Sequence, residues 1–176
     1  MCANRQLIIL FVLIPGLLVS LPAAAQQIKD YQILFTRESS RPDTTLNEEI
    51  RQEWPDDDGS VLNSIPYDLN QDGRKEKFVC NFLCGSGGCN WVIWDPSTRR
   101  SLGIVDGSVI YIHRRKRGGY PILETFWRLG GDQALVYYYE FSKGKYKRTE
   151  KISLSGGEIN AYFSKRPSVV DETGEQ

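Results

Sequence analysis

The stretch from Asp68 to Glu76 has the residue types and spacing of a calcium-binding loop. Its sequence, D-L-N-Q-D-G-R-K-E, places side-chain oxygens at the first, third, fifth and ninth positions and a glycine at the sixth. A tight turn directs alternate side chains toward its centre, where Ca²⁺ takes about six to eight oxygen ligands. The glycine permits the backbone conformation that a sharp turn requires. The expected ligands are side-chain oxygens of Asp68, Asn70, Asp72 and Glu76 and the backbone carbonyl of Arg74.

The same residue types also suit an acidic turn without a metal. Asp, Asn and Gly favour turns in which side-chain oxygens accept hydrogen bonds from nearby backbone amides. Three basic neighbours, Arg74, Lys75 and Lys77, would lower the affinity for a cation. Against this, three carboxylates crowded into one short segment repel one another unless a cation bridges them. We therefore expect a structural Ca²⁺ with a dissociation constant of about 10⁻⁴–10⁻³ M.

The segments after this loop carry a family resemblance. Val79 occupies the twelfth position, where an EF-hand has its bidentate glutamate, so an EF-hand fits poorly. The pattern D-x-N-x-D-G-x-x-E leading into a strand resembles the calcium loops of FG-GAP and VCBS repeats, which occur in β-propeller blades. Together with the C-G-S-G-G-C segment from Cys84 to Cys89, it also resembles small exported bacterial proteins of unassigned function. The resemblance covers a single loop copy and implies no activity.

The cysteines after residue 25 predict one disulfide. Cys84 and Cys89 form the natural pair in an oxidising compartment, because the four small residues between them let the loop close. A bridge from Cys80 is the alternative, since Cys80 and Cys84 could lie on one face of a strand. We predict the Cys84–Cys89 bridge, with Cys80 as a buried thiol. A zinc site lacks a fourth ligand nearby.

Residues 1–25 have the pattern of a secretory signal peptide. Arg5 supplies a positive charge, and the apolar run from Leu7 to Leu21 is shorter than a membrane span requires. Ala23-Ala24-Ala25 then offers a cleavage site before Gln26. The expected product is periplasmic or secreted, with no membrane span after cleavage. Because the chain carries 22 basic and 22 acidic side chains, its charge predicts no general affinity for nucleic acid.

Strand patterns dominate the rest of the chain. They predict a mostly β, single small domain over residues 26–164, either an antiparallel meander or sandwich or a partial propeller-like sheet, followed by a polar, flexible tail over residues 165–176. One short helix is expected near the N-terminus, from Thr45 to Trp54, ended by Pro55. The expected strands are Tyr31–Thr36, Lys77–Leu83, Asn90–Trp94, Ser108–His113, Pro121–Arg128, Gln133–Phe141, Tyr146–Leu154 and Glu158–Phe163.

The usual catalytic constellations are missing from the sequence. His113 is the only histidine, and neither a nucleophile nor an orienting carboxylate is evident for it. The basic run from Arg114 to Arg117 could hold an anionic ligand, although we favour a solvated hairpin tip. Glu124 and Asp132 are candidates for a hydrolytic carboxylate pair by composition alone.

These features favour an exported, calcium-stabilised binding domain over an enzyme. Its partner would be a protein or a cell-envelope component. One alternative is a periplasmic inhibitor or immunity protein that inserts its disulfide-tied glycine loop into an enzyme cleft. The other is an exported hydrolase with carboxylate chemistry.

Export makes the first prediction. The mature protein should begin at Gln26, because signal peptidase cleaves after small residues such as Ala23 and Ala25. N-terminal sequencing or intact-mass measurement of the exported product checks this. A full-length chain retained in the membrane would contradict it.

Overall fold

A computed structural model describes residues 31–46, 48–53, 61–81 and 84–166. The expected signal peptide and the last ten residues lie outside the described residues, as do residues 54–60, which include the aspartates Asp56, Asp57 and Asp58. In the described part of the chain, no helix is both long and apolar enough to cross a membrane.

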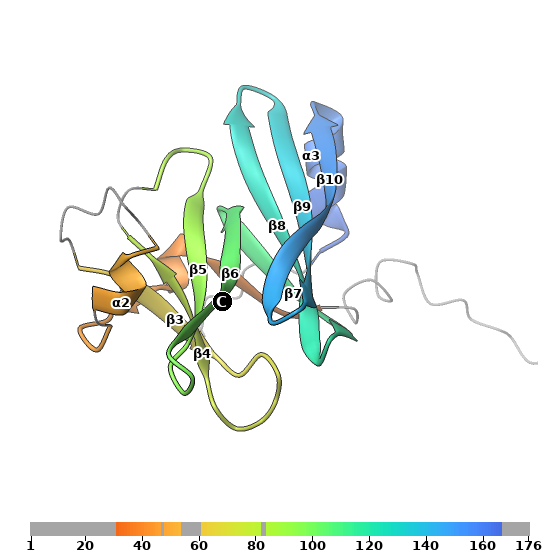
Figure 1. Ribbon diagram of the computed structural model, residues 1–176. Coiled ribbons are helices and arrows are strands. Elements are labelled where there is room, and N and C mark those ends of the chain that lie inside the picture. The colour runs from red at the N-terminus through yellow and green to blue at the C-terminus, as the bar shows by residue number, and fades with distance from the viewer. Residues whose placement is uncertain (1–30, 47, 54–60, 82–83, 167–176) are drawn as a thin grey trace, which may run out of the picture.

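Two antiparallel sheets of five strands each make up the fold (Figure 1). Sheet A has the order β1-β7-β8-β9-β10 and sheet B the order β2-β3-β4-β5-β6, so most neighbours in space are neighbours in sequence. Sheet A consists of β1 (Tyr31–Thr36), β7 (Val109–Arg117), β8 (Tyr120–Gly130), β9 (Gln133–Ser142) and β10 (Lys145–Ser155). Sheet B consists of β2 (Arg41–Pro42), β3 (Asn63–Tyr67), β4 (Glu76–Cys80), β5 (Cys89–Asp95) and β6 (Arg100–Gly107).

The main core lies between the inner faces of the two sheets. Side chains alternate between the two faces of a strand, so each sheet contributes every second residue to this core. One buried cluster joins Phe78, Trp91 and Ile93 of sheet B to Ile112 and Leu123 of sheet A. A mostly β domain with two antiparallel sheets is therefore confirmed.

Each sheet also buries part of its outer face. On sheet B, the single-turn helix α2 (Glu48–Arg51) places Ile50 against Val79 and Val92. On sheet A lies the helix α3 (Gly157–Ser164), which is labelled beside β10 in Figure 1. It places Tyr162 against Tyr111 and Phe126. These smaller clusters fix the two helices to the sheets.

The helix prediction was wrong in its position. The longer helix, α3, lies at the C-terminal end, where a strand over Glu158–Phe163 was expected. Among the described residues of Thr45–Trp54, the single turn α2 is the helical part. Strand β10 ends at Ser155, and the next residue, Gly156, has a φ of 49°. A Glu158 carboxylate oxygen then accepts a hydrogen bond from the Ser155 amide at 2.9 Å, at the start of the helix. The apolar residues that suggested a strand instead bring Tyr162 onto the outer face of sheet A.

The other strand predictions are confirmed to within a few residues. Phe82 and Leu83, at the end of the predicted strand Lys77–Leu83, lie outside the described residues. The hairpin of β9 and β10 forms as expected, with positive φ values of 53° at Lys143 and 79° at Gly144 in its turn. Strands β2, β3 and β6 were not predicted. Pro42, Pro66 and Gly103 interrupt the local strand pattern there. These segments are nevertheless strands because they pair with neighbouring strands of sheet B.

Candidate functional site

The segment from Asp68 to Glu76, here called the acidic turn, is held by hydrogen bonds from backbone amides to side-chain oxygens. Asp68 Oδ1 accepts from the amides of Gln71 and Asp72, at 2.7 and 3.1 Å, and Asp68 Oδ2 accepts from the Gly73 amide at 2.9 Å. Asn70 Oδ1 accepts from the Asp72 amide at 2.9 Å. Gly73 has a φ of 86°, which explains the glycine at this position. Asp68, Asn70 and Asp72 are thus brought into one turn.

Glu76 closes the turn from inside the protein. Its side chain is buried at the start of β4, where Oε2 accepts from the Leu69 amide at 2.8 Å and Oε1 accepts from the Tyr120 hydroxyl at 3.3 Å. Burial raises the pKa of Glu76 above its ordinary value, although the hydrogen bonds from Leu69 and Tyr120 oppose the shift. A carboxyl group binds Ca²⁺ in its ionised form, so a proton would compete with the cation at this residue.

The tip of the β7–β8 hairpin rests on the acidic turn. Lys116 Nζ donates to the Asn70 carbonyl at 3.2 Å and to Gln71 Oε1 at 2.9 Å. Asn70 Nδ2 also donates to the Tyr120 hydroxyl at 3.2 Å. The turn belongs to sheet B and the hairpin to sheet A, so these bonds join the two sheets at one end.

The oxygen donors of the turn fit Ca²⁺ in kind but are not gathered around one point. Ligands of one Ca²⁺ lie within about 5 Å of one another, because each is about 2.4 Å from the ion. Within the described ranges, the one group of three or more Cys, His, Asp or Glu side chains whose ligand atoms come within 4.8 Å consists of cysteines. Calcium binding at Asp68, Asn70, Asp72, Glu76 and the Arg74 carbonyl would therefore require the side chains to converge.

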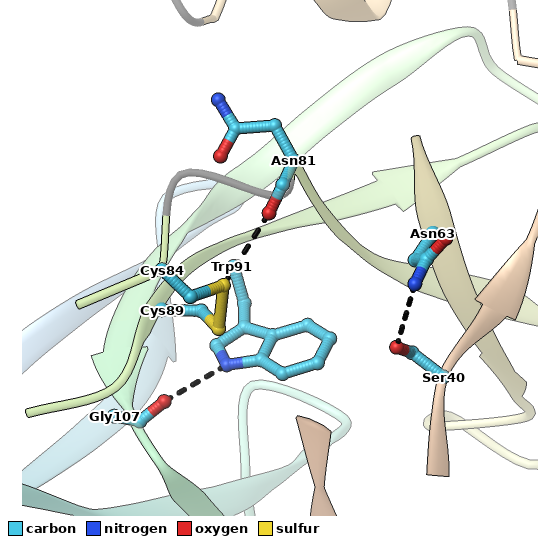
Figure 2. The surroundings of a disulfide bond; sticks show 7 residues. All are labelled: Ser40, Asn63, Asn81, Cys84, Cys89, Trp91 and Gly107. Carbon is cyan, nitrogen blue, oxygen red and sulfur yellow. Dashed lines mark hydrogen bonds between the residues drawn. A yellow bond between two sulfur atoms is a disulfide. The ribbon is translucent and has the colours of Figure 1, made fainter. Parts of the chain in front are cut away.

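The predicted disulfide between Cys84 and Cys89 is present (Figure 2). Cys80 is buried and lies outside this bridge. The two ends of the glycine segment meet where the Gly88 amide donates to the Gly85 carbonyl at 3.2 Å. Beside the bridge, Trp91 Nε1 donates to the Gly107 carbonyl at 3.0 Å (Figure 2). The disulfide thus closes a short loop at the first residue of β5.

The glycine loop packs against sheet A. The Arg128 amide donates to the Gly87 carbonyl at 3.0 Å, and a Cβ on Gly87 would come within 2.4 Å of the Arg128 carbonyl oxygen. Gly87 and Gly88 are buried, which leaves Gly85 and Ser86 as the exposed part of the loop. A loop held in this way offers little length for insertion into another protein's cleft.

Sequence reasoning missed a buried ionic cluster beneath α3. Glu124, on the outer face of β8, is wholly buried. Its Oε1 accepts from Tyr162 Oη and from Arg166 Nε, both at 2.6 Å, and its Oε2 lies 2.9 Å from His113 Nε2. The Arg166 guanidinium also stacks 3.5 Å from the centre of the Tyr162 ring. Arg166 was assigned to the polar tail, yet it anchors the end of α3 to the sheet.

The electrostatics of this cluster favour an ionised Glu124. Burial alone would raise the pKa of the carboxyl group, but the hydrogen bond with His113, the charge of Arg166 and the hydrogen bond from Tyr162 outweigh burial and lower the pKa to about 2. The same environment raises the pKa of Tyr138 to about 12, through burial first and the Glu124 charge second. Glu124 is therefore a fixed anion at neutral pH, and it cannot act there as a general acid.

A groove of about 490 Å³ lies on the same outer face of sheet A. It is flanked by irregular pairing in β7 between Ile112 and Lys116 and in β10 between Arg148 and Glu150. Such bulges redirect side chains and are common beside functional sites. The groove is lined by His113, Arg114, Arg115, Ile122, Tyr138, Glu140, Thr149 and Glu150.

The two candidate hydrolytic carboxylates are not brought together. Glu124 is buried within β8, whereas Asp132 is exposed in the turn after it. Six residues of extended strand separate Glu124 from Gly130, which is about 20 Å at about 3.3 Å per residue. Carboxylates that hydrolyse glycosides lie about 5–9.5 Å apart. This pair therefore has no geometry for that reaction.

Replacing Gly87 with alanine should lower the free energy of unfolding by about 2 kcal/mol, because the new Cβ would meet the backbone of Arg128. Urea denaturation followed by tryptophan fluorescence measures the change. Gly85→Ala is the matched control in the same loop, since a Cβ there has no neighbour within 4 Å. Equal midpoints for the two variants would contradict the close packing of the loop.

Replacing Glu124 with glutamine should lower the free energy of unfolding by about 3 kcal/mol at neutral pH, because Arg166 loses its buried counter-charge. The folded pKa of Glu124, about 2, lies below its ordinary value of 4.5. Its contribution to stability is therefore present above pH 4.5 and lost as the pH falls toward 2.

Urea midpoints measured across this pH range should accordingly fall more steeply in the parent protein than in Glu124→Gln. Glu140→Gln serves as the control, because Glu140 pairs with the exposed Arg117 at 3.9 Å and should contribute less than about 1 kcal/mol. Parallel pH profiles for the parent and Glu124→Gln would exclude the ionised cluster.

The chain as a whole matches no family model, no curated protein and no solved structure. The features that bear on its function are the acidic turn, the cysteines and the buried Glu124 cluster.

Proposed function

We propose that this protein is an exported binding domain without catalytic activity, stabilised by Ca²⁺ at the acidic turn from Asp68 to Glu76. The observation that carries the proposal is the position of this turn between the two sheets. Lys116 and Tyr120 of sheet A hold the turn through Asn70 and Glu76. A cation bound there would strengthen a junction between the sheets, which is a structural role.

The turn keeps acceptor positions for a cation once its side chains converge. Asp68 and Asp72 use their carboxylate oxygens to accept backbone amide bonds, and a carboxylate has about four acceptor positions in all. The amide bonds can therefore persist while further lone pairs face a cation. Bound Ca²⁺ would supply a doubly positive charge that offsets the repulsion among these carboxylates.

The disulfide supports export, because such bonds persist mainly in oxidising compartments. For the binding surface we propose the groove on the outer face of sheet A. Arg115 and Glu140 give it charges of both signs beside the ring of Tyr138. Such a lining suits a polar protein or cell-envelope component better than an apolar ligand.

Calcium should stabilise the folded protein by mass action. At a calcium concentration ten times the dissociation constant, the gain in the free energy of unfolding is about 1.4 kcal/mol. For a domain of this size, thermal melts in millimolar calcium and in chelator should differ by about 3–6 °C. Differential scanning calorimetry of the signal-free protein makes the comparison directly.

Asp72→Asn should abolish this difference and should lower the melting temperature in chelator only slightly, because it loses the exposed hydrogen bond that Asp72 Oδ2 accepts from Asn70 Nδ2 at 3.0 Å. The asparagine retains an oxygen for the Arg74 amide, which Asp72 Oδ1 accepts at 2.8 Å, but it removes the negative charge. Asp132→Asn removes an exposed carboxylate in a different turn and should preserve the calcium effect. Identical melts with and without calcium for the parent protein would overturn the metal site and leave a plain hydrogen-bonded turn.

A further inference from the structure

Cys80 lies against the disulfide formed by Cys84 and Cys89. The three Sγ atoms are all within 4.8 Å of one another, although Cys80 itself is not part of the bridge. A thiolate next to a disulfide can attack one of its sulfurs and displace the other. The cluster therefore holds both reactants of an exchange reaction in one place.

We propose that these cysteines form a thiol–disulfide exchange centre that transfers the thiol from buried Cys80 to the more exposed Cys84. The Cys80 thiolate attacks Cys89 Sγ, the Cys84–Cys89 bond breaks, and a Cys80–Cys89 bond forms. The electron pair of the broken bond leaves on Cys84 Sγ. Cys80 gives its proton to solvent and Cys84 takes one up, so one disulfide replaces another and no oxidant or reductant is consumed.

Burial determines which sulfur leaves. Cys80 and Cys89 are each only 2% exposed, whereas Cys84 is partly exposed. A thiolate is stabilised by water and penalised by an apolar environment. Attack on Cys84 would leave the anion on buried Cys89, whereas attack on Cys89 leaves it on Cys84, at the protein surface.

The carbonyl oxygen of Asn81 provides a second, independent indication. It lies 3.3 Å from Cys84 Sγ (Figure 2). In the disulfide this sulfur carries no hydrogen and cannot donate to the carbonyl. After exchange, the Cys84 thiol can donate its S–H to Asn81, within the reach of a sulfur hydrogen bond. The structure thus already contains an acceptor for the product.

The strands bring Cys80 and Cys89 onto one face as diagonal neighbours. Cys80 ends β4 and Cys89 begins β5, which are antiparallel neighbours in sheet B. Both side chains belong to the inner core cluster, so they lie on the same face of the sheet. Because Val79 pairs with Val92, Cys80 lies opposite Trp91 and two residues from the position opposite Cys89. A Cys80–Cys89 bond would therefore link the two strands diagonally and release Cys84 at the start of the glycine loop. Cys84 would then be a site for modification by a small-molecule thiol or disulfide.

Alkylation of the folded protein tests the exchange. The signal-free protein is incubated with N-ethylmaleimide without reductant, and the labelled and bridged peptides are then mapped under non-reducing conditions. We expect the label on Cys84, together with a Cys80–Cys89 bridge. Where thiolate formation limits attack, the labelling rate should rise about tenfold per pH unit below the pKa of the thiol.

Cys80→Ser is the matched control, because it removes the attacking thiol and keeps the original bridge. Label on Cys84 should then be lost. Three results in the parent protein would overturn the proposal: label on Cys80 with the Cys84–Cys89 bridge intact, label on Cys89, or no label at all.

A second variant tests the product bridge without relying on alkylation. In Cys84→Ser, Cys80 and Cys89 should form a disulfide when the folded protein is exposed to oxidised glutathione. The serine replaces a partly exposed residue, so we expect the fold to be retained, which circular dichroism can verify. A folded variant in which both cysteines remain thiols would show that they cannot bridge, and the proposal would be wrong.

Discussion

The other features of the structure depend on the packing of the inner faces of the two sheets against each other. Trp91 of sheet B and Leu123 of sheet A belong to the buried cluster between these faces. Because side chains alternate along a strand, burying one face fixes what the other face presents. On β8, Leu123 faces the shared core, while Glu124 and Phe126 face outward beneath α3. On β4, Phe78 and Cys80 face the shared core, which places the Cys80 thiol beside the disulfide.

The two sheets are also joined by polar contacts near their edges. The acidic turn of sheet B meets the β7–β8 hairpin of sheet A through Lys116 and Tyr120. The glycine loop meets β8 through the Arg128 amide. Both contacts use backbone groups of loops that would otherwise need water or another partner. The loops that carry the candidate chemistry are therefore held by the sheet opposite to their own.

The Glu124 cluster shows how a charged group can be tolerated in an apolar layer. A buried carboxylate is costly unless it is paired and hydrogen-bonded. Here Arg166 supplies the counter-charge, Tyr162 supplies a hydroxyl donor, and His113 lies on the second oxygen. The arrangement keeps Glu124 ionised and fixes the end of α3 to sheet A. Glutamate, histidine and tyrosine often occur together in catalytic sites, but here they have a structural role.

The sequence by itself determined the strands of sheet A, the β9–β10 hairpin, the acidic turn and the Cys84–Cys89 bridge, because each depends on residues close together in the chain. Alternation, glycines in turns and the short cysteine spacing are all local signals. Only the tertiary structure decided the features that join distant residues. Arg166 lies 42 positions from Glu124, and Lys116 lies 46 positions from Asn70. The segment from Glu158 to Phe163 forms a helix because β10 ends before Gly156 and Tyr162 packs on an apolar site of sheet A. The local sequence pattern indicates neither this site nor its distance from β10.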